Sequence, residues 1–415
     1  MTTRKLAVAL AAGLSLVTAL TGCSTSSTSN PSTAGAAPAK DTTATLNIWG
    51  YVDQKITPWI GRETTAFKNE YPNVTVNYTY VPYDQMAAKV LGTAVAGGGP
   101  DGIFYNPSDA AQLSQSGVLA DMTPYLSAFP DASQIPSSVV WKDQEKIVSI
   151  QGYVNTTALF YNKTILDKLG LTPPQTVAQL DSDLKAVAAA GYGGMTMCAA
   201  PTAESEFQIF PWMLGEGQNY GSFTTSGVSA VFSQFSSWIH AGYIPKDVVN
   251  WTQGDAWDKF SAGQYAFTQN GNWLLGRAAK LPFEWGVVPI PAGSAGSHSV
   301  GGGEGFSIGA KSSNPALTWQ FLQEALLSKT GELSILKDAG SLPVRADAAT
   351  APELKSDPAL AVFADIVKNM IARPGTPKIS GDLVAMGKIW NSVAAGIDSP
   401  DVGAQQVVEQ LNNVK

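Results

Sequence analysis

Residues 45–50 of this chain read Thr-Leu-Asn-Ile-Trp-Gly, an alternation of polar and apolar side chains that ends in glycine, as a half-buried strand entering a loop does. A helical pattern follows over residues 56–71, and residues 74–78 form the next strand. Residues 84–96 are again helical, and residues 102–105, Gly-Ile-Phe-Tyr, are a short apolar strand. Strands that alternate with helices predict an α/β fold with ligand-facing loops at the strand ends.

The same alternation resumes in the second half of the chain. The predicted helices there are 179–190, 227–241 and 315–328, and the predicted strands are 195–199, 263–269, 285–289 and 305–309. From residue 329 onward the periodicity is largely helical, and no internal repeat of fixed period is found. Residues 44–415 are long enough for two domains of usual size.

The first residues resemble a bacterial export signal. Arg4 and Lys5 supply a positive start, and residues 6–20 are apolar over a length too short to span a bilayer comfortably. Leu20-Thr21-Gly22-Cys23 follows at once and resembles a lipobox, in which the cysteine thiol receives a lipid. We expect a signal peptide over residues 1–22 and lipidation at Cys23; a buried N-terminus with a chance cysteine is the less favoured alternative.

The segment after Cys23 consists almost entirely of Ser, Thr, Ala, Pro, Gly and Asn. Such a composition cannot bury enough apolar surface to fold, so we expect residues 23–43 to be a flexible tether. The folded part would then work at the outer face of the bacterial cytoplasmic membrane, held by acyl chains and not by a spanning helix.

Composition excludes several kinds of partner. The formal net charge of −7 disfavours nucleic acid and anionic membrane surfaces. Arginine, which usually recognises phosphate and carboxylate groups, occurs only at positions 4, 62, 277, 345 and 373, and this disfavours an anionic solute. His240 and His298 are far apart without metal-ligand spacing, so we expect neither a metal nor a cofactor. Cys198 lies in an apolar segment and is expected to pack in the core.

Six short motifs occur in a characteristic order. They are Leu46-Asn47-Ile48-Trp49, Pro100-Asp101-Gly102-Ile103-Phe104, Ala158-Leu159-Phe160-Tyr161-Asn162-Lys163, Asn270-Gly271-Asn272-Trp273, Val287-Val288-Pro289-Ile290-Pro291 and Gly302-Gly303-Glu304-Gly305-Phe306-Ser307-Ile308. Together they resemble the extracellular solute-binding proteins of family 1, typified by maltose-binding protein, over nearly all of the chain after the tether.

This resemblance implies the periplasmic-binding-protein type II fold, in which two α/β lobes, each a sheet flanked by helices, close around a ligand cleft. By analogy, residues 44–157 and 271–312 form the N-terminal lobe, and residues 158–270 and 313–415 form the C-terminal lobe. The implied function is that of a monomeric protein, not an enzyme, which captures a mono- to oligosaccharide and delivers it to the permease of an ABC importer.

Two other functions stay open at this stage. A polyamine or polyol would also suit acidic residues among aromatic walls. A lipoprotein glycoside hydrolase would need two carboxylates that flank the scissile bond, and the carboxylates in the loops do not decide between these readings.

A neutral sugar presents hydroxyls around its rim and C–H faces above and below, so its site needs aromatic rings together with amides and carboxylates. The candidate binding residues are Trp49, Tyr51, Asp53, Asn106, Ser108, Asp109, Gln151, Tyr153, Glu204, Glu206, Phe207, Trp212, Asn270, Asn272, Trp273, Gly303 and Glu304, with Arg345 and Trp390 as weaker members. Trp273 is the strongest candidate, because the resemblance implies a tryptophan that stacks on the ligand.

Structural roles remain as alternatives for some of these residues. Trp49 and Phe207 suit a core. Asp109 suits a helix cap. Arg345 suits an ion pair with a carboxylate.

Overall fold

The computed structural model describes residues 37–52 and 58–414. The expected signal peptide, Cys23, most of the expected tether and Asp53 lie outside the described residues. The end of the tether segment is described, and it contacts the folded part: the Lys40 ammonium pairs with Glu70 and lies 4.4 Å from the centre of the Tyr71 ring. A free tether would therefore end before Lys40.

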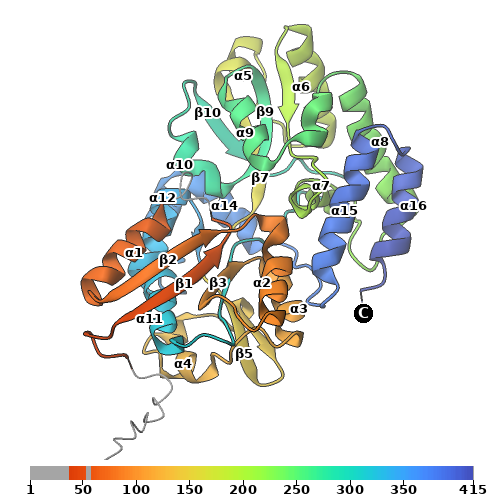
Figure 1. Ribbon diagram of the computed structural model, residues 1–415. Helices are drawn as coiled ribbons and strands as arrows, with labels where there is room; N and C mark the ends of the chain where they lie inside the picture. The colour runs from red at the N-terminus through yellow and green to blue at the C-terminus, as the bar shows by residue number, and fades with distance from the viewer. Residues whose placement is uncertain (1–36, 53–57, 415) are drawn as a thin grey trace, which may run out of the picture. The chain divides into compact units, whose positions relative to one another are not determined.

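Six strands form the first sheet, in the order β2-β1-β3-β11-β5-β4. Strands β1, β2, β3 and β5 of this sheet are labelled in Figure 1. Their bounds are β1 Ala44–Gly50, β2 Val74–Tyr80, β3 Gly102–Tyr105, β4 Val140–Asp143, β5 Lys146–Gln151 and β11 Gly305–Ile308. β1 runs parallel to β2 and β3, whereas β11 is antiparallel to both of its neighbours. Leu46 and Ile48 are fully buried while Asn47 between them is exposed, so the predicted alternation is confirmed. We call the part built on this sheet the first lobe.

Helices cover both faces of the first sheet. Their bounds are α1 Trp59–Glu70, α2 Met86–Val95, α3 Ala110–Gln115, α4 Thr123–Ala128, α11 Pro315–Leu326 and α12 Lys329–Ala339. α1 and α11 share one core, in which the rings of Phe67 and Phe321 meet edge to face at 5.4 Å. This packing differs from the expected boundary, which assigned all of residues 313–415 to the other lobe, because the apolar side of α11 finds its partner on α1.

Four strands form the second sheet, in the order β10-β7-β9-β8. Their bounds are β7 Thr157–Asn162, β8 Gly193–Thr196, β9 Tyr265–Gly271 and β10 Trp285–Val288. β7 is antiparallel to β9 and β10. The pairing of β10 with β7 places residues 285–288 on the second sheet, although 271–312 was expected in the first lobe, so the chain returns to the first sheet only at β11. We call the part built on this sheet the second lobe.

The second lobe carries most of the remaining helices (Figure 1). Their bounds are α5 Lys163–Leu169, α6 Val177–Ala189, α7 Ala203–Gly215, α8 Thr225–His240, α9 Gln253–Ser261, α10 Leu275–Ala278, α13 Glu353–Ser356, α14 Pro358–Lys368, α15 Ile379–Ala394 and α16 Pro400–Leu411. α7, α8, α15 and α16 contribute to one large core. Cys198 is a free, fully buried thiol, as predicted for a packing residue.

Three segments cross between the two sheets and are joined to one another. β6 (Tyr153–Val154) pairs with β12 (Leu342–Pro343), and the main chain of Asn155 pairs with that of Gly302. The buried Asn272 side chain accepts a hydrogen bond from the Thr156 main-chain nitrogen at 2.8 Å and donates one to the Gly340 carbonyl at 2.8 Å. Neighbouring crossing segments of this kind form a hinge. Between residue 37 and residue 414, outside the gap at 53–57, no helix has both the length and the apolar character needed to cross a membrane.

Candidate functional site

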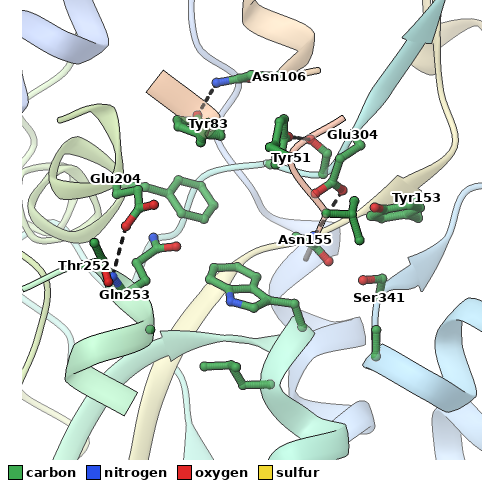
Figure 2. A pocket seen from close by; sticks show the side chains of 18 of the residues that line it. Tyr51, Tyr83, Asn106, Tyr153, Asn155, Glu204, Thr252, Gln253, Glu304 and Ser341 are labelled. Atoms are coloured by element: carbon green, nitrogen blue, oxygen red, sulfur yellow. Dashed lines mark hydrogen bonds between the residues drawn. The ribbon is translucent and has the colours of Figure 1, made fainter. Parts of the chain in front are cut away.

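A cavity of about 330 Å³ lies between the two sheets, beside the crossing segments (Figure 2). Its volume falls in the range of roughly 300–1,000 Å³ that is usual for small-molecule sites. The aromatic residues of the lining are Tyr51, Trp59, Tyr80, Tyr83, Tyr153, Phe207 and Trp273. The polar side chains in the lining are Asn106, Asn155, Glu204, Thr252, Gln253, Glu304, Ser341 and Arg373.

Phe207 and Trp273 form a stacked aromatic pair on the second lobe. Their rings stack with centroids 5.9 Å apart and planes inclined by 25°. Phe207 lies on α7, and Trp273 lies in the turn after β9. A Cβ atom on Gly271 would lie 1.8 Å from the Trp273 ring, so glycine at this position makes room for the indole. Both rings are partly exposed.

Tyr51 and Tyr83 lie on the first lobe with their rings edge to face at 4.9 Å. The amide of Asn106 donates a hydrogen bond to the Tyr83 hydroxyl (Figure 2), and the Asn106 carboxamide oxygen accepts one from the Ser108 main-chain nitrogen at 3.1 Å. Burial raises the pKa of both phenols well above the ordinary value, so they remain neutral hydroxyls.

Glu304 lies where the chain crosses back toward the first sheet, and only 8% of it is exposed. The Asn155 amide nitrogen lies 3.4 Å from a Glu304 carboxylate oxygen (Figure 2). Burial raises the pKa of Glu304 to about 7, although hydrogen bonds from Tyr153 and Tyr51 lower it in part. The preceding Gly303 has a φ of +116°, and a Cβ atom there would lie 2.1 Å from the Tyr153 carbonyl oxygen. Glycine is therefore needed to bring the Glu304 carboxyl to the cavity.

Glu204 and the start of α9 form another part of the wall. Thr252 caps α9 in a reciprocal arrangement with Asp255, in which the Asp255 nitrogen donates to the Thr252 hydroxyl at 3.2 Å and the Thr252 nitrogen donates to the Asp255 carboxylate at 2.9 Å. The Gln253 main-chain nitrogen donates to the Glu204 carboxylate at 3.0 Å. These contacts hold the Thr252 and Gln253 side chains at the cavity edge.

Arg373 brings a positive charge to the cavity, but that charge is already paired. The guanidinium donates to the Glu206 carboxylate at 3.0 and 2.5 Å and to the Gly301 carbonyl at 2.8 Å. Glu206 is fully buried and also accepts a hydrogen bond from Tyr220 at 3.1 Å. The site therefore offers no unpaired arginine fork for a phosphate or carboxylate.

The structure brings eight of the predicted residues to the cavity lining: Tyr51, Asn106, Tyr153, Glu204, Phe207, Trp273, Gly303 and Glu304. Two more lie directly behind them. Glu206 holds Arg373, and the Gln151 amide donates to the Gly302 carbonyl at 2.8 Å and so supports the glycine turn. Phe207 is a lining residue, so the alternative of a purely core role does not describe it.

Four predicted residues lie in other surroundings. Trp212 packs in the core and donates its indole N–H to Gln269 at 2.8 Å. Trp390 is fully buried and stacks on Phe232 at 5.7 Å. The Arg345 guanidinium pairs with Asp131 at 3.0 Å and with Asp347 at 2.9 Å, in agreement with the alternative of an ion pair with a carboxylate. Trp49 is outside the cavity lining, with the Lys89 ammonium over its ring at 4.9 Å. Periodicity does not distinguish a core ring or a buried ion pair from a ligand contact.

The remaining predicted residues act as local supports. The Asn270 amide donates to the Gln253 carbonyl at 2.9 Å, and Asn272 joins the crossing segments. Ser108 lies two residues after Asn106 and outside the lining. Asp109 makes no side-chain cap of α3 and instead accepts a hydrogen bond from the Ser380 hydroxyl.

Several lining residues escaped the sequence interpretation. Tyr80 is the last residue of β2 and Tyr83 follows this strand, where the rule that binding sites lie at strand ends would have found them. Asn155, Gln253 and Arg373 carry no such signal, because their positions depend on how distant segments meet. Within the described residues, no group of three or more His, Cys, Asp or Glu side chains is arranged to hold a metal ion.

The sequence is similar to those of known binding proteins. The sequence profile of the family described as "Bacterial extracellular solute-binding protein" matches residues 64–362. The arabinooligosaccharide-binding protein of Bacillus subtilis is 24% identical over 315 residues, which cover 70% of this chain and 71% of that protein.

Solved structures share the fold. The GacH receptor of Streptomyces glaucescens, determined unliganded and with acarbose, is 22% identical with a TM-score of 0.80, over 90% of this chain and 100% of its own. Maltose-bound MalE3 of T. maritima is 18% identical with a TM-score of 0.81, again over 90% of this chain and 100% of its own. The α/β, two-lobed fold expected from the sequence is therefore confirmed.

Proposed function

Because the chain belongs to the family of bacterial extracellular solute-binding proteins, we propose that it captures a carbohydrate in the cavity between its lobes and delivers it to the permease of an ABC importer. The observation that carries this proposal is the composition of the cavity wall. The partly exposed Trp273 ring, which stacks on Phe207, offers a surface for the C–H face of a pyranose, while amides, hydroxyls and carboxylates line the same cavity.

The location of the cavity supports a capture function. Its lining comes from the first lobe, from the second lobe and from the crossing segments, so a bound solute contacts both lobes at once. A ligand that binds only the closed arrangement shifts the population toward it. The names of the relatives support a sugar as this solute, since they refer to arabinooligosaccharide, acarbose and maltose.

We further propose that the chain is a lipoprotein at the outer face of the cytoplasmic membrane. The apolar run at residues 6–20 and the Leu20-Thr21-Gly22-Cys23 motif support processing before Cys23 and attachment of acyl chains to its thiol. Cys23→Ser should move the protein from the membrane fraction to the soluble extracytoplasmic fraction. Unchanged membrane association of this variant would contradict the anchor.

We also propose that the protein binds its sugar without cleaving it. Glu204 and Glu304 both line the cavity, and a glycosidase would need such a pair of carboxylates. In Figure 2, however, Glu304 is grouped with Tyr51, Tyr153 and Asn155, while Glu204 lies with Thr252 and Gln253, whose main-chain nitrogen it binds. Incubation of the protein with any sugar that it binds should return the sugar unchanged; cleavage products would establish the hydrolase alternative.

The first experiment is a thermal-shift screen of the full chain in mild detergent against mono-, di- and oligosaccharides, with polyamines, polyols, amino acids and phosphate as comparison ligands. A ligand that binds only the native state raises the melting temperature by mass action. A shift confined to one class of sugar is the expected result. A shift with a polyamine or an anion, together with no shift with any sugar, would be compatible with the fold but would contradict the proposal that the ligand is a carbohydrate.

A further inference from the structure

In the described part of the cavity lining, Glu204 and Glu304 are acidic and Arg373 is basic. Arg373 is already neutralised by the buried Glu206, which lies behind the lining. Glu304 is the more enclosed of the two lining carboxyls.

Within the described residues, the groups that approach the Glu304 carboxyl are neutral. Its carboxylate is approached by the Asn155 amide at 3.4 Å and by the hydroxyls of Tyr51 and Tyr153. None of the ion pairs in the described part of the chain includes Glu304. A buried carboxylate without a counter-charge is costly, so this site would gain from a cation supplied by the ligand.

The surroundings of Glu304 also suit a cation. The rings of Trp59 and Tyr153 meet edge to face at 6.2 Å, and the Tyr51 ring also lines the cavity. Aromatic faces attract ammonium groups. The Gly303 carbonyl, which accepts one long hydrogen bond of 3.4 Å from Tyr51, provides a further acceptor beside the carboxylate.

We propose that the carbohydrate taken by this site carries a protonated amine, which pairs with the Glu304 carboxylate beside the aromatic side chains of Tyr51, Tyr153 and Trp59. This inference rests on the proposed carbohydrate-binding function and narrows it to basic sugars. A neutral sugar can donate hydroxyls to Glu304 but brings no counter-charge. An acidic sugar adds a second negative charge and is rejected.

The test is isothermal titration of the full chain in mild detergent with matched sugars in which an amino group replaces the 2-hydroxyl of each ring. The pairs are glucosamine and glucose, and the fully deacetylated chitin disaccharide and cellobiose. N-acetylglucosamine and N,N′-diacetylchitobiose form a third arm, because acetylation retains the nitrogen and removes its charge. In the pair whose size fits the cavity, the amine should bind about tenfold tighter or more than its neutral partner, and acetylation should remove this advantage.

Glu304→Gln retains the shape of the side chain and removes its charge, so it should abolish the difference between the two members of the pair. Glu145→Gln, in the exposed turn between β4 and β5, is the matched control and should preserve the difference. A neutral sugar that binds as tightly as its amine counterpart, or a preference that survives Glu304→Gln, overturns the inference and leaves the proposed function standing. If no sugar, neutral or basic, binds to the protein, this result contradicts the proposed function itself.

Discussion

The carboxylate of Asp109, in the loop after β3 of the first lobe, accepts a hydrogen bond from the hydroxyl of Ser380, in the first turn of α15 of the second lobe. The two residues are 271 positions apart in the chain, and Asp109 is buried. Burial raises the pKa of Asp109 to about 6, and the Ser380 hydrogen bond lowers it in part. This contact joins the two lobes outside the cavity lining, so we expect it to stabilise the arrangement of the lobes in which they share the cavity.

Ser380→Ala should therefore weaken ligand binding by roughly two- to tenfold, in line with a net hydrogen-bond contribution of about 0.5–1.5 kcal/mol. Titration calorimetry with the sugar found by the screen measures the change. Ser229→Ala is the matched control, because the Ser229 hydroxyl donates to Asp401 within the second lobe. Equal effects of the two substitutions on affinity would rule out an interlobe role for Ser380.

Trp273→Ala should abolish binding or weaken it by at least about tenfold, because the stacked pair that it forms with Phe207 is lost together with the buried aromatic area. The melting temperature of the unliganded protein should change little, since the ring is partly exposed. Trp212→Phe serves as the opposite control: it removes a buried hydrogen bond to Gln269 and should lower stability with affinity unchanged. Unchanged affinity in Trp273→Ala would remove this residue from the site.

Glu304 should make the unliganded protein less stable as the pH rises. Its pKa is raised from an ordinary value of 4.5 to about 7 in the folded state, so the folded state holds the proton more tightly than the unfolded state. The resulting cost is absent below about pH 4.5, grows between pH 4.5 and 7, and is fully present above pH 7, with an upper limit of about 3 kcal/mol.

Relative to the wild type, Glu304→Gln should thus gain stability as the pH is raised from 5 to 8. Urea unfolding at both pH values measures the gain, and Glu145→Gln provides the reference for an exposed glutamate. An equal difference in the free energy of unfolding at pH 5 and pH 8 would show that Glu304 titrates normally.

Breaking the buried pair of Arg373 and Glu206 should destabilise the protein strongly. Glu206→Gln leaves a buried guanidinium without its counter-charge, and the loss of one partner of such a pair typically costs about 3–5 kcal/mol. The double substitution Glu206→Gln with Arg373→Met should recover part of this loss. Additive effects of the two substitutions in a double-mutant cycle would show that the pair does not act as a unit.

Local sequence patterns anticipated a large part of the fold. The strands at residues 102–105, 285–289 and 305–309 and the helix at 179–190 each have counterparts in the structure within a few residues. They were predictable because alternation and helical periodicity reflect burial of one face of a single element. Gly303, Glu304 and Trp273 were also found to line the cavity: the family resemblance implied Trp273, and Glu304 stood out as a polar residue within a run of glycines.

The assignment of elements to lobes depended on long-range packing. No local pattern reveals that β10 pairs with β7, or that α11 packs on α1, because many apolar faces are compatible with either partner. The same reason explains why Trp390 and Arg345 were chosen as binding residues although one stacks on Phe232 and the other pairs with Asp131 and Asp347.

The sequence by itself thus determined the alternation of strands and helices, the polar and aromatic character of the loops, and the order of motifs typical of extracellular solute-binding proteins. Only the tertiary structure decided which of those loops meet. Asn155, Gln253 and Arg373 come from three distant segments and acquire their place in the cavity from strand pairing, a helix cap and a buried ion pair. A binding site between lobes is a property of contacts across the chain, and the free energies of those contacts depend on distance in space and not on position in the sequence.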